Sequence, residues 1–150
     1  LEFEVKWEVD SKTDVPSLCI KIKADAEIEN DGFLAALCGC DWTVPISDGS
    51  GQMINTNACG PGIGAEINLP EVSISLPAEA TLQFDIQPDT VMVKCLKKGS
   101  SIEDICNIDR SDGNYTFSLK TGEYVYRITA EWQNGNRAEY GFAGWGLPTD

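Results

Sequence analysis

The sequence contains no histidine, which removes the usual general base of enzymes and the commonest neutral metal ligand. Catalysis by a Ser-His-Asp or Cys-His arrangement is therefore excluded. Chemistry that uses only carboxylates or tyrosine is still compatible with the composition, but no motif in the sequence indicates it. We therefore expect a protein that is not an enzyme, without a cofactor and without a metal site.

Positive charge is also scarce. The 150 residues include 11 Lys and Arg against 24 Asp and Glu, a net charge of −13, and the longest basic run is Lys97-Lys98. Proteins that bind nucleic acids need a basic surface to displace counterions from phosphates, and anionic membranes select for basic surfaces as well. The predicted partners are therefore an unknown protein, a peptide or a glycan, and not a nucleic acid.

Long apolar runs are missing. No stretch of 18 apolar residues could cross a membrane, so the chain itself is not an integral membrane segment, and no signal peptide is visible. A signal, lipid anchor or membrane helix could still have preceded residue 1. The length predicts a single domain over residues 1–144, in which residues 1–28 add extra strands, and a tail over residues 145–150.

Several segments of the sequence alternate between apolar and polar residues with a period of two, as half-buried β-strands do. This alternation occurs near the N-terminus, around residues 18–22, and in a final hairpin. Turn signals separate short strands along most of the chain, and no helix of normal length is visible. The predicted fold is an all-β, immunoglobulin-like antiparallel β-sandwich. The alternating apolar residues are Leu1, Phe3, Val5, Trp7 and Val9, then Leu18, Ile20 and Ile22, then Tyr124, Tyr126, Ile128, Ala130 and Trp132.

The sequence also predicts the length of the turn in the final hairpin. Asn134-Gly135 is typical of a two-residue hairpin loop, but such a loop would place Ala138, Tyr140 and Phe142 on the polar face. A three-residue loop over residues 134–136, or a bulge, keeps both apolar sets on one face. We expect this second arrangement.

The six cysteines are an even number and a high proportion, which is rare in a reducing cytosol. They predict disulfide bonds and an exported protein, located outside the cell or in the cell envelope. Cys95 and Cys106 flank a polar loop, and a bridge between them would close about 12 residues and contribute about 2–3 kcal/mol. The alternative is a thiolate metal site, but the C-x-C spacing of Cys38 and Cys40 differs from that of structural zinc knuckles.

The other four cysteines leave alternatives open. Cys38 and Cys40 are two residues apart in one strand, so we expect them to share a face and not to bond to each other. Each then needs its own partner, and the candidates are Cys19 and Cys59. The long loop over residues 45–64, which contains Cys59, is the expected place for any binding site.

The sequence contains two weaker motifs. Residues 107–113 place oxygen ligands at alternate positions before Gly113, faintly like a calcium loop, but the glycine comes one position late and an ordinary turn is favoured. Exposed aromatic residues in a row would indicate carbohydrate binding. Trp7, Trp42 and Trp132 lie on apolar strand faces, where packing in the core is expected, and only Trp145 is predicted to be exposed.

Residues 33–143 contain a pattern in which Pro-Asp precedes a strand, followed by a Y-x-Y-x-(V/I)-x-A-x-W strand and by Y-x-F. This pattern resembles the Ig-like C-terminal extracytoplasmic domain of Firmicutes lipoproteins and of antirepressor-type membrane sensors. That family has no established activity, so the resemblance implies a fold and a compartment but no site. The matching residues are Pro88-Asp89, Tyr124 to Trp132 and Tyr140 to Phe142, with weaker matches at Cys40-Asp41-Trp42 and Asn57 to Pro61.

The resulting hypothesis is a non-enzymatic domain of a Gram-positive bacterium, tethered to the envelope, that binds or senses a ligand. The alternative is a carbohydrate- or peptide-binding accessory module of a larger surface protein. A third hypothesis is an enzyme that uses carboxylates or tyrosine, and a deep cleft with paired carboxylates would favour it.

Overall fold

The computed structural model describes residues 15–24, 28–29, 32–45, 53–56, 69–111, 113–133 and 135–147. Every regular element in these ranges is a β-strand, as the alternating sequence predicts. Within the same ranges, no helix is long and apolar enough to cross a membrane. The predicted N-terminal strand over residues 1–9 lies outside the described residues.

The first sheet has six strands and is antiparallel. Its order is β10, β11, β7, β1, β2, and β3 pairs with β1 as well. The alternating residues Leu18, Ile20 and Ile22 of β1 are all buried, as predicted. The strands are β1 (Leu18–Ala24), β2 (Ile28–Glu29), β3 (Phe33–Leu34), β7 (Ala78–Phe84), β10 (Asp109–Ser111) and β11 (Asn114–Ser118).

The second sheet has seven strands in the order β5, β4, β13, β12, β8, β9. Strand β6 pairs with β13 in parallel, and the other pairs are antiparallel. Because β12 occupies one edge of β13 along its length, β4 and β6 share the other edge. The strands are β4 (Ala36–Pro45), β5 (Met53–Thr56), β6 (Glu71–Ser75), β8 (Thr90–Lys97), β9 (Glu103–Cys106), β12 (Gly122–Glu131) and β13 (Arg137–Leu147).

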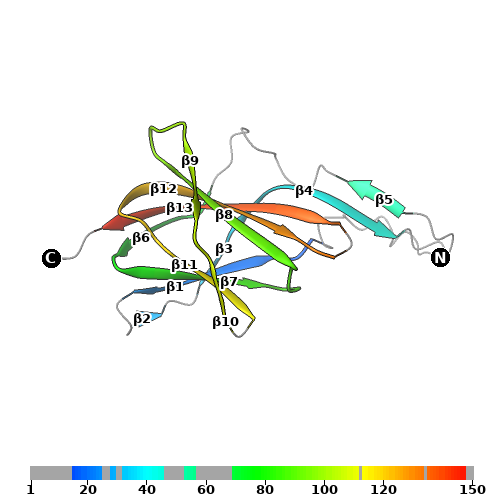
Figure 1. Cartoon of the computed structure of the whole chain (residues 1–150), viewed down its shortest axis with the longest axis horizontal. Coiled ribbons are helices and arrows are strands. Elements are labelled where there is room, and N and C mark those ends of the chain that lie inside the picture. Colours follow the sequence, from blue (N-terminus) through cyan, green and yellow to red (C-terminus); the bar gives the residue numbers. More distant parts are fainter. Residues whose placement is uncertain are drawn as a thin grey trace, which may run out of the picture.

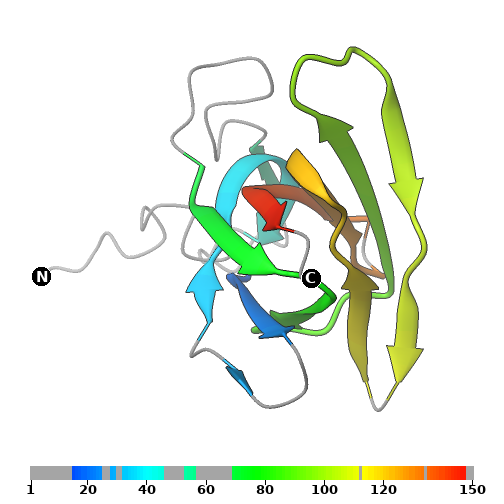
Figure 2. The ribbon, with the colours of Figure 1, turned by 90° about the vertical axis from the view of Figure 1, so that its left-hand side faces the viewer.

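The two sheets pack face to face as a β-sandwich, and Figures 1 and 2 show the two layers from perpendicular directions. The core lies between them and is built from the inward-facing residues of both. Phe117 of the first sheet contacts Tyr126 and Phe142 of the second, with ring centroids 5.5 and 6.5 Å apart. Tyr126 and Phe142 stack on each other at 5.0 Å. These aromatic contacts join the layers and are typical of well-packed cores.

Buried hydroxyl groups in this core find backbone partners. The Tyr140 hydroxyl donates to the Pro16 carbonyl at 2.6 Å, which ties the segment before β1 to β13. The Tyr126 hydroxyl accepts a hydrogen bond from the Lys120 backbone N–H at 2.9 Å, across the corner between β11 and β12. Such partners are needed because an unpaired buried polar group is costly.

The final hairpin confirms the predicted extra residue. Ile128 lies opposite Tyr140 and Ala130 opposite Ala138, so both apolar sets face the core. Trp132 donates its backbone N–H to the Asn136 carbonyl, which leaves three residues between the paired positions. The loop is therefore of the predicted length but begins one residue earlier than expected.

Two expectations about segments need correction. Strand β13 continues to Leu147, so Trp145 and Leu147 belong to the sheet, whereas the tail was expected to begin at residue 145. Its partner β6 explains the difference, because a parallel pairing between distant segments leaves no local sequence signal. The expected long loop over residues 45–64 contains strand β5, while most of it lies outside the described residues.

The expectation that Cys38 and Cys40 share a face is wrong. The register between β4 and β13 shifts, because Glu139 lies opposite Gly39 while Tyr140 lies opposite Leu37. Cys38 is therefore the extra residue of a β-bulge, which breaks the alternation. Cys40 packs against the core, while the Cys38 sulfur lies near the place where a side chain on Gly141 would project.

Candidate functional site

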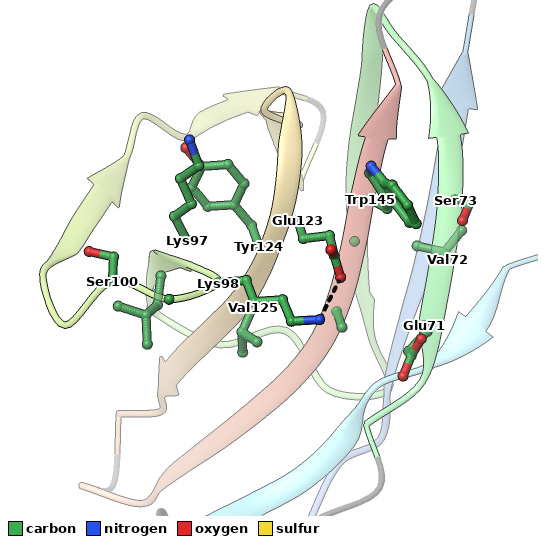
Figure 3. A pocket seen from close by; sticks show the side chains of 14 residues that line it. Glu71, Val72, Ser73, Lys97, Lys98, Ser100, Glu123, Tyr124, Val125 and Trp145 are labelled. Atoms are coloured by element: carbon green, nitrogen blue, oxygen red, sulfur yellow. Dashed lines mark hydrogen bonds and ion pairs between the residues drawn. The ribbon is translucent and has the colours of Figure 1, made fainter.

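A surface pocket of about 360 Å³ lies on the outer face of the seven-stranded sheet. Strands β6, β13, β12 and β8 contribute its floor and walls, together with the turn that follows β8 (Figure 3). Its volume is at the lower end of the range of about 300–1,000 Å³ for small-molecule sites. The pocket differs from the sequence-based expectation, which placed any site in the loop over residues 45–64.

Trp145 is the aromatic wall of this pocket, with 49% of its surface exposed. Alternation along β13 turns its neighbours Gly144 and Gly146 inward, where larger residues do not fit. A side chain on Gly144 would press on the Tyr126 ring, and one on Gly146 would collide with the Lys120 carbonyl. Trp145 consequently faces outward, which confirms the prediction that it is exposed. Trp132, in contrast, is buried as expected.

The strand pairings place polar groups beside the indole ring. Trp145 lies opposite Glu123 of β12 and opposite Ser73 of β6. The Lys98 ammonium forms an ion pair with Glu123 at 3.3 Å, drawn as the dashed line in Figure 3. The Lys98 backbone N–H also donates to the Glu123 carbonyl at 2.9 Å. The next residue, Gly99, has a φ of 88°, which allows the chain to turn back at this point.

The pocket holds charges of both signs. Glu71 and Glu123 contribute two carboxylates and Lys98 contributes one ammonium group. The side chain of Lys97 lies on the other face of the sheet, beside Gly122 and Tyr124. The Lys98–Glu123 pair is largely exposed, with side-chain exposures of 74% and 44%. Exposed pairs of this kind stabilise a fold by only about 0–1 kcal/mol, so a ligand can compete for both groups at little cost.

The floor between these walls is low. Ala143 and Val125 are outward-facing neighbours in adjacent strands and are only half-buried. Neither side chain is long enough to fill the space beside Trp145. Figure 3 shows the indole of Trp145 and the Glu123–Lys98 pair on either side of β13. The arrangement can hold a small group against an aromatic ring while offering hydrogen-bond donors and acceptors, and it has no buried acid or base.

Two other hollows lie on the described surface. One, of about 300 Å³, is lined by Lys94, Arg127, Arg137, Glu131 and Glu139 among others and has no aromatic wall. Arg127 is held there by Glu103 at 2.6 Å and by Glu139 at 3.7 Å. The other, of about 320 Å³, is lined in part by Cys106 and Lys120. Among these three pockets, an exposed aromatic ring occurs only at Trp145.

Cys95 and Cys106 are neighbours but are not bonded to each other in this structure, where both are free thiols. Cys106 lies opposite Val93, and Cys95 lies opposite Asp104, so the two cysteines are diagonal neighbours on the buried face. Burial and a hydrogen bond with Cys95 raise the pKa of the Cys106 thiol. Diagonal positions are about 7–8 Å apart, slightly beyond the span of about 4.4–6.8 Å between the Cα atoms of a disulfide.

Lys120 completes this cluster. Burial lowers the pKa of its ammonium group, but a hydrogen bond to Cys95 and charge interactions with Cys95, Cys106 and Asp104 together outweigh this effect, and the pKa is raised. The same ammonium lies 3.9 Å from Asp104 and 5.7 Å from the centre of the Tyr124 ring. A thiol that burial keeps protonated, like that of Cys106, is structural and poorly nucleophilic.

The remaining cysteine predictions have mixed outcomes. Cys19 and Cys38 are free thiols, so neither forms the expected bridge in this structure. The bulge at Cys38 is the physical reason in its case. Cys40 is not one of these free thiols, and a pairing with Cys59 stays a prediction because Cys59 lies outside the described residues. The described residues contain no cluster of three or more Cys, Asp or Glu that could hold a metal ion.

The calcium-like segment forms a tight hairpin between β10 and β11. Ser111 lies opposite Asn114, and Gly113 has a φ of 81°, which only glycine adopts readily. Asp112 lies outside the described residues. The glycine is therefore explained by the turn, which is the interpretation that the sequence favoured.

No family model, curated protein or solved structure matches this chain. The resemblance to the extracytoplasmic Ig-like domain therefore stays a prediction. Any function must be inferred from the chain's own residues.

Sequence reasoning identified Trp145 but missed its partners. Glu123 and Lys98 are 25 residues apart and meet only through the pairing of β8 with β12. Glu71 and Ser73 reach the pocket through the parallel pairing of β6 with β13. The single signal available in the sequence was the tryptophan between two glycines.

Proposed function

We propose that this chain is a non-enzymatic, immunoglobulin-like domain located outside the cytoplasm, and that it binds or senses a ligand at the Trp145 pocket. The observation that carries this proposal is that the exposed ring of Trp145 lies beside short side chains and beside the solvent-exposed ion pair between Lys98 and Glu123. Binding sites combine an aromatic or apolar surface with a few placed polar groups, and this pocket has both.

The immunoglobulin-like assignment is supported by the strand order of residues 71–147. Strands β6, β13, β12, β8 and β9 form one layer, and β7, β11 and β10 form the other. The parallel contact between the first and last strands and the corner formed by Tyr126 both occur in immunoglobulin-like folds. On this assignment, β1 to β5 extend both sheets of a standard sandwich.

The proposal that the domain is not an enzyme is supported by the chemistry of its perturbed groups. The raised pKa values of Cys106, Tyr126 and Tyr140 are all caused first by burial. The Tyr126 and Tyr140 hydroxyls are held by backbone groups, and the Cys106 thiol stays protonated. Catalytic groups need a pKa near the working pH, so these groups suit packing better than proton transfer.

The extracytoplasmic location is proposed from the six cysteines, and the Cys95–Cys106 pair offers a test. A movement of about 1 Å in the edge strand β9 would bring the pair within disulfide range. When the protein is secreted through an oxidising compartment, we expect it to contain the Cys95–Cys106 bridge. Peptide mapping without reduction detects this bridge. Six free thiols in the secreted chain would contradict both the bridge and the argument for export.

Binding at the pocket can be tested without knowing the natural ligand. The ¹⁵N-labelled chain is screened against a library of small-molecule fragments, and shifts of the backbone amide signals are mapped. We expect fragment contacts to concentrate at β13, β12 and the turn at Lys98–Gly99, and to disappear in Trp145→Ala. As a matched control, Ile105→Ala removes another exposed apolar side chain, 67% exposed, and should leave the pattern unchanged. Contacts scattered over the surface, or concentrated elsewhere, would contradict the proposed site.

A further inference from the structure

The Trp145 pocket carries little net charge on a strongly acidic protein. The chain has a net charge of −13, yet the charged groups on the Trp145 face of the pocket are the carboxylates of Glu71 and Glu123 and the Lys98 ammonium, which is paired with Glu123. A site for a cationic peptide would hold a cluster of carboxylates, and a site for an anion would hold an excess of lysines, whereas this lining has an excess of a single carboxylate. The charges therefore favour an uncharged ligand, because like charges and unpaired charges are penalised in a binding site.

The shape of the pocket favours a flat ligand. Trp145 presents about half of its surface to solvent beside the low floor at Ala143 and Val125. An aromatic ring contributes a large contact area at a low cost in conformational entropy. A ligand with one apolar face can therefore stack on the indole while it rests on the floor.

The polar groups around the ring favour a ligand that both donates and accepts hydrogen bonds. Lys98 offers donors only, Glu71 and Glu123 offer acceptors only, and the hydroxyls of Ser73 and Ser100 offer both. Figure 3 shows Ser73 on the Trp145 side of the pocket and Ser100 on the Lys98 side. Such a mixed rim suits a ligand that carries hydroxyl groups around its edge.

From these three observations we propose that the pocket binds a neutral carbohydrate, one face of whose sugar ring stacks on Trp145 while its hydroxyls bond to Glu123, Lys98 and the rim. The C–H groups on one face of a pyranose supply the apolar surface, and its hydroxyls supply donors and acceptors at the edge. This inference rests on the proposed function, since it names the ligand class of the same pocket.

The direct test is calorimetric titration of the full chain with neutral tetrasaccharides. The probes are the β-1,4-linked tetramers of N-acetylglucosamine and of glucose and the α-1,4-linked tetramer of glucose, with tetralysine and tetraglutamate as charged comparators. We expect at least one tetrasaccharide to bind with a dissociation constant of about 1 mM or tighter. The binding should be almost unchanged between low and high salt, because screening acts only on interactions between charges.

Three variants identify the contact. Trp145→Ala should weaken the binding at least about tenfold, because it removes the stacking surface. Trp145→Phe keeps an aromatic ring and should retain most of the affinity. Ile105→Ala is the matched control, because Ile105 is exposed on the same sheet but does not line the pocket. It should bind like the wild type.

The other outcomes overturn the inference in distinguishable ways. Trp145-dependent binding of tetralysine alone, weakened by salt, would refute the carbohydrate and leave the proposed binding function standing. Tetrasaccharide binding that survives Trp145→Ala would refute the stacking geometry. A failure of every tetrasaccharide would also refute the ligand class. The fragment mapping does not depend on ligand class, and it decides separately whether the pocket is a binding site.

Discussion

The Tyr126 hydroxyl offers a sharp test of the corner between β11 and β12. Tyr126→Phe keeps the ring between Phe117 and Phe142 and removes only the acceptor of the Lys120 backbone N–H. A donor left without its partner in a partly buried place costs about 1–2 kcal/mol. We therefore expect the free energy of unfolding of the variant at pH 8 to be about 1–2 kcal/mol lower than that of the wild type.

The same hydroxyl makes this penalty depend on pH. Burial raises the pKa of Tyr126 from about 10 in the unfolded chain to about 12 in the folded one. The folded state therefore holds the proton more tightly, and the resulting stability is present below pH 10 and lost as the pH rises from 10 to 12. At pH 11 the wild type should have lost about 1.4 kcal/mol through this group.

The phenylalanine variant has no such proton to lose. Its penalty of about 1–2 kcal/mol at pH 8 should therefore shrink to nearly zero at pH 11. The measurement is guanidinium unfolding of both chains at the two pH values, in reducing buffer. Tyr124→Phe is the matched control, because Tyr124 lies on the same strand and its hydroxyl makes no hydrogen bond to the described residues. A penalty that is absent at pH 8, or equal at both pH values, would refute the reasoning.

Other substitutions test the packing and the bridge. Gly146→Ala should lower the free energy of unfolding by about 2 kcal/mol or more, because its new methyl group would collide with backbone. Gly39→Ala is the matched control and should change the free energy of unfolding by less than about 0.5 kcal/mol, because no atom lies within 4 Å of the added carbon. Phe142→Ala should cost about 3–5 kcal/mol in chemical denaturation, because its ring is fully buried, and a smaller loss would show that the sheets are not packed as described. Reduction of the proposed Cys95–Cys106 bridge should lower the free energy of unfolding by about 3 kcal/mol, and the double alanine variant should lose this part of the response to reductant.

Local patterns in the sequence predicted much of the fold. Strict alternation identified β1 and the final hairpin, and the need to keep Ala138, Tyr140 and Phe142 inside predicted the three-residue loop. These features depend on residues that are close together in the chain. The assignment to a two-layered all-β fold rests on many such local signals.

The errors arose where distant segments meet. The bulge at Cys38 depends on the register with β13, about a hundred residues away, and a single inserted residue reverses which face Cys38 occupies. The tail was expected at Trp145 because its flanking glycines resemble a loop. In the structure those glycines fit against Lys120 and Tyr126, and the segment is a strand held by β6.

The pocket itself was beyond sequence reasoning for the same reason. Trp145, Glu123, Lys98 and Glu71 come from four segments and meet only through strand pairings. Composition nevertheless carried one useful fact. Because the whole chain is strongly acidic, the small excess of one carboxylate at the pocket is informative about its ligand.

The most direct measurement of the central claim uses the indole N–H signals of the four tryptophans in the ¹⁵N-labelled chain. The signal of Trp145 is assigned by its absence in Trp145→Phe, and the chain is titrated with the neutral tetrasaccharides. The account predicts that the Trp145 signal moves while the signal of buried Trp132 stays in place. A Trp145 signal that does not move at saturating tetrasaccharide, or movement of Trp132 alone, would contradict it.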